Sequence, residues 1–274
     1  MTRRTRAALL VAFAAPAALV LSAAPASAAD DATVSVLHAI PTGSGADVVD
    51  VYAGDALLID NFTPGTLKTL EVPAGTYDLA VYADGDTPDG GTPVLEAPGT
   101  EVPAGANATV TANLTADGKA ALNVFVNDTS SVAAGQGRLV VRHIAAAPAV
   151  DVRANGDVLF ADLTNPNEDS AEVPAASYEA DVVLAGTDTV ALGPADVEVA
   201  EGATTIVYAW GSAEGESLDL ATQVVEAGSG TPGSVPAGDG SSVPAGVPGW
   251  ALALGALAAL GVAASTVRIA STKA

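Results

Sequence analysis

The sequence has 274 residues, with 32 acidic and 10 basic side chains and no cysteine, which gives a formal net charge of -22. The absence of cysteine excludes disulfides, thiolate metal sites and cysteine nucleophiles. Because the acidic surface repels phosphate backbones, we expect no nucleic acid partner.

The first 28 residues have the features of a secretory signal peptide. Three arginines at positions 3, 4 and 6 precede an apolar run over residues 7–21, and Ala26-Ser27-Ala28 offers the small side chains that a signal peptidase accepts. We expect cleavage after Ala28. The alternative is a segment that is retained as a membrane anchor, for which this apolar run is short.

The central region contains an internal repeat, which we assign to residues 29–132 and 133–227. Three motifs recur in the same order, with small gaps between them. They are Val36-Leu37-His38-Ala39 and Val141-Arg142-His143-Ile144, Val49-Asp50-Val51 and Val150-Asp151-Val152, and Val72-Pro73-Ala74-Gly75-Thr76-Tyr77 and Val173-Pro174-Ala175-Ala176-Ser177-Tyr178.

Within each repeat the apolar residues recur with a period of two. Tyr77, Leu79 and Val81, for example, alternate with more polar or smaller residues, as half-buried strands do. Turn signals such as Asn155-Gly156 separate the strands, and no stretch keeps a helical period. The sequence therefore predicts an all-β fold of two tandem antiparallel β-sandwiches, each with seven strands and of immunoglobulin-like or transthyretin-like type.

A strand ending in His, a Pro-containing turn, Val-Asp-Val and then Val-Pro-Ala-Gly-Thr-Tyr together resemble the bacterial family of domains of unknown function numbered 4397. The resemblance covers residues 33–225 in two copies. The first copy departs from the pattern by inserting residues 42–45, which lengthens one loop. The resemblance implies an exported β-sandwich module of bacterial surfaces, and it implies no activity.

The C-terminal part reads as a stalk followed by a membrane anchor. Residues 228–249 are rich in Gly, Ser, Pro and Ala, and residues 250–267 carry no charge. A helix of that length just crosses the hydrocarbon core of a membrane. Basic residues in the tail, 268–274, would hold that tail in the cytoplasm. We expect a single-pass cell-membrane protein with an extracellular ectodomain; because the anchor is rich in Ala and Gly, a cleaved or buried tail is the alternative.

His38 and His143 lie at equivalent positions of the repeat, with Asp50 and Asp151 nearby in each copy. Such a pair can act as an acid-base dyad. Both histidines stand at the end of an apolar stripe and no nucleophile accompanies them, so we assign His38, Asp50, His143 and Asp151 structural roles. We predict no catalytic residue and no cofactor.

Asp84, Asp86 and Asp89 in a Gly-rich loop are the weak candidates for a metal site, with Ca²⁺ as the ion that carboxylates at this spacing prefer. A solvated loop is the competing interpretation, since the second repeat keeps only one acid there. Tyr52, Tyr82, Tyr208 and Trp210 are either a platform for stacking sugars or core residues, and we favour the core.

From these features we expect a non-catalytic protein of the bacterial cell envelope that displays paired sandwiches for binding or as a spacer. Its partners would be the membrane, through the C-terminal helix, and an unknown protein or glycan. The alternatives are a calcium- or carbohydrate-binding adhesin and, with less support, a hydrolase.

Overall fold

The computed structural model describes residues 31–228, which belong to one compact unit. No helix in the described part has the length and apolarity needed to cross a membrane. The expected signal peptide (1–28), membrane helix (250–267) and tail (268–274) lie outside the described residues, as does the stalk (228–249) apart from Gly228.

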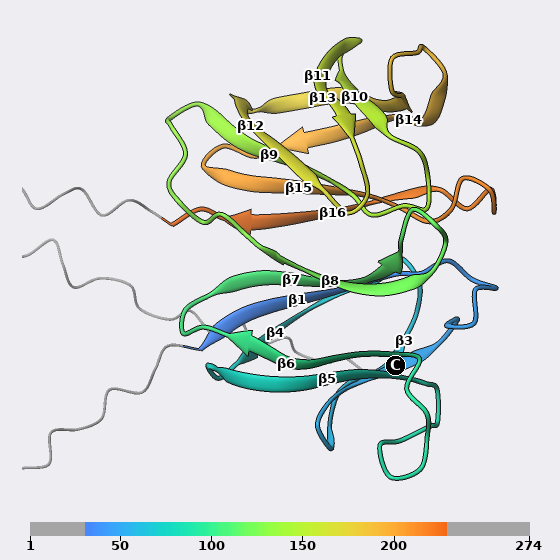
Figure 1. Cartoon of the computed structure of the whole chain (residues 1–274). Helices are drawn as coiled ribbons and strands as arrows, with labels where there is room; N and C mark the ends of the chain where they lie inside the picture. Colours follow the sequence, from blue (N-terminus) through green and yellow to red (C-terminus); the bar gives the residue numbers. More distant parts are fainter. Residues whose placement is uncertain (1–30, 229–274) are drawn as a thin grey trace, which may run out of the picture. The chain divides into compact units, whose positions relative to one another are not determined.

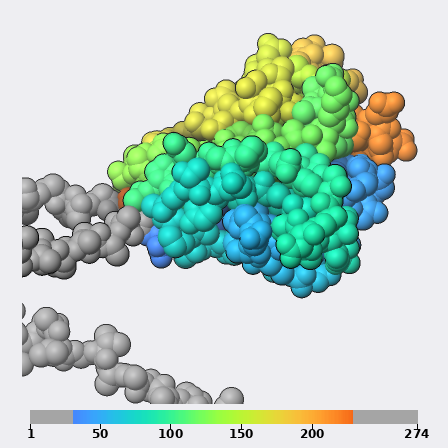
Figure 2. Space-filling model, turned by 60° about the horizontal axis from the view of Figure 1, so that its bottom comes forward, coloured from blue at the N-terminus to red at the C-terminus, as the bar shows by residue number. Residues whose placement is uncertain are grey.

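Eight strands form the first sandwich (Figure 1). One sheet has the order β4-β1-β7-β8 and the opposite sheet has the order β3-β2-β5-β6. Figure 2 looks onto this sandwich, coloured blue to green, from below the view of Figure 1. The strands are β1 (Ala32–Ala39), β2 (Val49–Ala53), β3 (Ala56–Phe62), β4 (Leu67–Val72), β5 (Gly75–Ala83), β6 (Leu95–Val102), β7 (Asn107–Leu114) and β8 (Ala120–Val126).

The second sandwich repeats this strand order. Its sheets are β12-β9-β15-β16 and β11-β10-β13-β14. The strands are β9 (Gln136–His143), β10 (Val150–Ala154), β11 (Asp157–Leu163), β12 (Glu168–Pro174), β13 (Ala176–Leu184), β14 (Val190–Val199), β15 (Ala203–Trp210) and β16 (Asp219–Glu226).

Two details differ from the sequence-based expectation. Each sandwich has eight strands rather than seven, and β1 runs parallel to β7 as β9 does to β15, so the sheets are not wholly antiparallel. Between the paired strands the chain crosses to the opposite sheet and returns twice, which is the long connection that a parallel pair requires. An alternating pattern shows which face of a strand is buried, but it carries no information on the direction of the neighbouring strand.

Alternation along the strands builds a core between the two sheets of each sandwich. In β5 the side chains of Tyr77, Leu79 and Val81 are turned inward, while Thr76 and Asp78 are exposed. β13 shows the same sequence of exposed and buried positions. Both sandwiches are therefore built on the periodicity that the sequence displays.

A third apolar cluster lies between the sandwiches, where sheet β4-β1-β7-β8 meets sheet β12-β9-β15-β16. Leu37 of β1, Ile144 after β9 and Ile206 of β15 are fully buried in it. The central strands of these two sheets are therefore covered on both faces, and every residue of β15 is buried. The two sandwiches form a stack of four sheets with three apolar layers, within one compact unit.

Candidate functional site

The two histidines of the chain have the same environment in the two sandwiches. Each is 1% exposed. Nε2 of His38 donates to the carbonyl oxygen of Ala46 at 2.8 Å, and Nε2 of His143 donates to that of Pro148 at 2.9 Å. Nδ1 accepts a main-chain N–H two residues further on in both. Burial lowers the pKa of both imidazoles, so both rings are neutral and tie a loop to the end of a strand.

The aspartates of the repeat bind backbone rather than the histidines. Asp50 accepts the main-chain N–H of Asn61 at 2.9 Å and that of Gly85 at 3.3 Å. Asp151 makes the two equivalent bonds at 2.8 Å each, and they lower the pKa of its carboxyl. Asn61 has a φ of 53°, so the Asp50 carboxylate holds an irregular backbone in β3. These contacts are of the kind that a structural role requires.

The acidic loop between β5 and β6 does not gather its carboxylates. Asp84, Asp86 and Asp89 are all exposed. Within residues 31–228 there is no group of three or more His, Cys, Asp or Glu side chains that could hold a metal ion. Ca²⁺ takes six to eight oxygen ligands in proteins, so the calcium hypothesis is supported by composition alone.

The aromatic side chains considered as a sugar platform are core residues. Tyr52 and Tyr82 are each 7% exposed and meet edge to face, with ring centroids 5.5 Å apart. Tyr208 and Trp210 belong to the apolar layer between the sandwiches. A stacking platform needs exposed ring faces, so the interpretation of these residues as core is the right one.

Arg142 is the centre of a buried polar network between the sandwiches that sequence reasoning missed. The guanidinium group donates to Glu168 at 2.6 Å, to the Tyr208 hydroxyl at 2.9 Å and to the Asn127 side-chain oxygen at 2.9 Å. It also lies 4.5 Å from the centroid of the Phe125 ring, a cation–π contact. Asn127 and Phe125 come from the first sandwich or its end, whereas Arg142 belongs to the second.

Gln223 adds a second set of bonds across the same interface. Its side-chain oxygen accepts the hydroxyls of Tyr208 at 2.6 Å and Thr109 at 3.1 Å, and its amide nitrogen donates to Ser35 at 2.9 Å. Burial raises the pKa of Tyr208, so its hydroxyl keeps the proton that it donates. The interface between the sandwiches thus combines an apolar layer with buried hydrogen bonds, which fixes how these two sheets pair.

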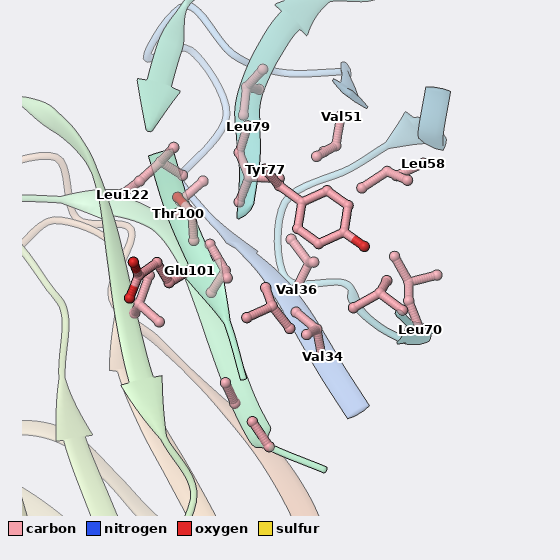
Figure 3. A pocket seen from close by; sticks show the side chains of 18 of the residues that line it. Val34, Val36, Val51, Leu58, Leu70, Tyr77, Leu79, Thr100, Glu101 and Leu122 are labelled. Carbon is pink, nitrogen blue, oxygen red and sulfur yellow. The ribbon is translucent and has the colours of Figure 1, made fainter. Parts of the chain in front are cut away.

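The first sandwich contains a cavity of about 160 Å³ between its two sheets. Its walls are almost wholly apolar, and Figure 3 shows Tyr77 among Val51, Leu58 and Leu70, with Thr100 and Glu101 on another side. Several inward-facing side chains there are only half-buried, in contrast to a filled core. The lining also includes Val124 and Val126, which are 50% and 74% exposed, so the cavity reaches the surface beside β8.

The second sandwich has only about 20 Å³ in the corresponding place. The strand registers show which lining residues differ between the two sandwiches. Val34 of β1 corresponds to Leu139 of β9, because they pair with equivalent residues of β4 and β12. Thr100, which faces Tyr77, corresponds to Val197, which faces Tyr178 and is 4% exposed. In the opposite sense, Leu70 and Leu79 on the first lining correspond to Ala171 and Ala180 in the second sandwich. Side-chain size alone therefore does not account for the difference in volume.

Strand β9 of the second sandwich makes a close contact with the connection between β14 and β15. At Gly137 an added Cβ would lie 2.3 Å from the Ala200 carbonyl oxygen, so only glycine permits this contact, and the first sandwich has Ala32 at the equivalent position. Thr205 of β15 donates to the Glu198 carbonyl oxygen at 3.3 Å, whereas Ala108 at the same place in β7 has no hydroxyl. The sequence contains these differences, but only the strand register of the structure shows which residues correspond.

An unfilled apolar volume is costly for a protein. At roughly 24 cal/mol per Å³, a cavity of the size found in the first sandwich costs up to about 4 kcal/mol. The equivalent sandwich in the same chain shows that the fold is able to fill this space. The cavity is therefore the best candidate for a functional site in the described residues.

A comparison with known families found a match for part of the chain. Residues 32–153 match the family model DUF4397, a domain of unknown function. The chain carries a DUF4397 region. This confirms the family inferred from the sequence for residues 32–153, whereas the assignment of a second copy stays a prediction. The DUF4397 match covers the whole first sandwich, with its cavity, together with β9 and all but the last residue of β10 in the second. No curated protein matches the chain.

Proposed function

We propose that the protein is a non-catalytic component of the bacterial cell envelope that displays its two sandwiches as one unit outside the membrane. Export by residues 1–28, a stalk over residues 228–249 and an anchor over residues 250–267 are parts of this proposal. We also assign both sandwiches to the immunoglobulin-like or transthyretin-like type and the second sandwich to the same family as the first.

The buried interface between the sandwiches is the observation that carries the proposal. A tandem of independent domains would expose both outer sheets and bend at the linker. Here the Arg142 and Gln223 networks and the apolar layer around Ile206 join the two sheets. A stack of four sheets with one fixed arrangement is suited to holding a surface away from a membrane or presenting it to a partner.

The non-catalytic part of the proposal draws on the histidines. Both rings are buried, and Nε2 of each donates a hydrogen bond to a backbone carbonyl oxygen. Neither histidine therefore has a free nitrogen directed at a substrate. A general base must reach the proton that it abstracts. The hydrolase alternative would need a different base, and no observation in the described residues favours one.

Protease treatment of intact cells of the source bacterium tests the proposed display. We expect an externally added protease to degrade the region 31–228 while a cytoplasmic marker stays intact, and we expect this region to fractionate with the membrane. Protection of the region in intact cells, with degradation only after lysis, would refute the proposed location. Recovery in the culture supernatant would refute the anchor and leave export standing.

A further inference from the structure

We propose that the cavity of the first sandwich binds one small, neutral, apolar molecule of about the size of benzene or toluene. This inference goes beyond the envelope function above and does not depend on it. It rests on the volume of the cavity, on the chemistry of its walls and on its absence from the second sandwich.

The volume sets the size of the ligand. The cavity measures about 160 Å³. An engineered apolar cavity of about 150 Å³ in another protein accommodates benzene. A ligand of six to eight carbon atoms, either a ring or a compact branched chain, is therefore the size that fits. A long acyl chain would not be enclosed.

The walls determine the polarity of the ligand. Two of the polar side chains on the lining have their hydroxyls engaged with backbone, because Tyr77 donates to Pro73 O at 2.7 Å and Thr100 to Ala97 O at 2.9 Å. Away from the open side beside β8 the walls are apolar, so water there would lack the two to four polar partners that an ordered water needs. The site therefore favours hydrocarbon over water or over a hydrogen-bonding ligand.

Charge excludes anionic ligands in particular. Glu101, on the lining, is exposed and carries the only formal charge among the lining residues. The formal net charge of the whole chain, Glu101 included, is -22. An anion that approaches this mouth meets like charge and would lose its hydration inside an apolar space. A fatty carboxylate or a phosphate ester is therefore a poor ligand, and a neutral hydrocarbon is a good one.

A methyl-resolved NMR titration of the full chain in lipid nanodiscs tests the site, with toluene as the probe. We expect toluene to shift the methyl signals of Val34, Val36 and Leu79, which line the cavity, and to leave those of Leu139 and Val141 unchanged. Benzoate has the same ring with a negative charge, and at the same concentration we expect it to shift none of them.

Two variants that fill the cavity locate the site. Ala108→Phe builds a ring of the probe's size into the space, and Val34→Leu introduces the residue that the second sandwich has at that position. We expect toluene affinity to fall at least tenfold in Ala108→Phe and by less in Val34→Leu. Ala120→Phe is the matched control, because Ala120 is exposed and does not line the cavity, and it should leave the affinity unchanged.

All variants share the same lipid, so partition of the probe into the nanodisc cancels in the comparison. Val34→Leu protects the test against misfolding, since the second sandwich tolerates leucine at this place. Unshifted cavity methyls at saturating toluene, equal shifts with benzoate, or equal affinity of Ala108→Phe and Ala120→Phe would each overturn the proposal. None of these outcomes bears on whether the protein is displayed at the cell surface.

Discussion

Replacing Arg142 by alanine tests the claim that the two sandwiches are held together by a buried polar interface. The substitution removes hydrogen bonds to Glu168, Tyr208 and Asn127 and the contact with the Phe125 ring. Removing one partner of a buried, hydrogen-bonded ion pair costs about 3 to 5 kcal/mol. The Glu168 side chain is 38% exposed and water can solvate it again, so we expect a loss near the lower end, about 3 kcal/mol.

Thermal and denaturant unfolding of the wild type and the variant measure this loss. For a folded unit of this size, 1 kcal/mol moves the Tm by about 2 to 4 °C, so we expect a decrease of about 6 to 12 °C. Arg153→Ala is the control, because Arg153 pairs with Asp181 inside the outer sheet of the second sandwich. This pair is bidentate and its side chains are 19% and 16% exposed, so we expect a loss of about 1.5 kcal/mol, below that of Arg142. Equal losses in the two variants would refute the assignment of Arg142 to a stabilising interface.

Three further predictions concern the turn at Gly65, the histidines and the acidic loop. Gly65 and Gly54 both have positive φ, but only at Gly65 would a Cβ meet the Trp210 ring, at 3.2 Å. Gly65→Ala should therefore lower the free energy of unfolding by about 1 kcal/mol more than Gly54→Ala. Equal effects of the two substitutions would contradict the close packing at Gly65. Burial holds the folded-state pKa of His143 below its unfolded value of about 6.5, so the stability that depends on the neutral ring is complete above that pH and lost below it. The Tm difference between wild type and His143→Gln should shift against the wild type as the pH falls from about 7.5 to about 5, and a constant difference would show that the ring does not titrate on unfolding. Millimolar Ca²⁺ should leave the Tm unchanged and produce no saturable heat in a calorimetric titration, because the carboxylates of the β5–β6 loop are exposed and dispersed. A saturable heat would support the calcium hypothesis.

Much of each sandwich was readable from its strands. The alternation in Thr76 to Val81 predicts one buried and one exposed face, and the structure has those faces. The repeat of Val49-Asp50-Val51 as Val150-Asp151-Val152 places two strands at equivalent positions in the two sandwiches. Alternation and turn chemistry are properties of neighbouring residues, so they can be recognised in the sequence without knowledge of the fold.

The parallel pairing of β1 with β7 was not readable, and neither was the partner of the second buried face of β1. Leu37 and Ala39 are as apolar as the neighbours that face the first core, which is consistent with a strand covered on both sides. Nothing local identifies Ile206 and Tyr208 as the residues that cover it. Contacts over such separations depend on where the chain returns after crossing the opposite sheet.

The sequence by itself determined that this region forms sheets, that it does so twice, and that its excess of acids faces water, because each of these follows from residue type and short-range order. Only the tertiary structure decided that the two sandwiches share a buried interface and that one of them is hollow. Whether a space remains between two sheets depends on how the side chains of both sheets meet. A glycine at position 137 in one copy and an alanine at position 32 in the other differ by a single methyl group, whose effect appears only when the facing sheet is in place.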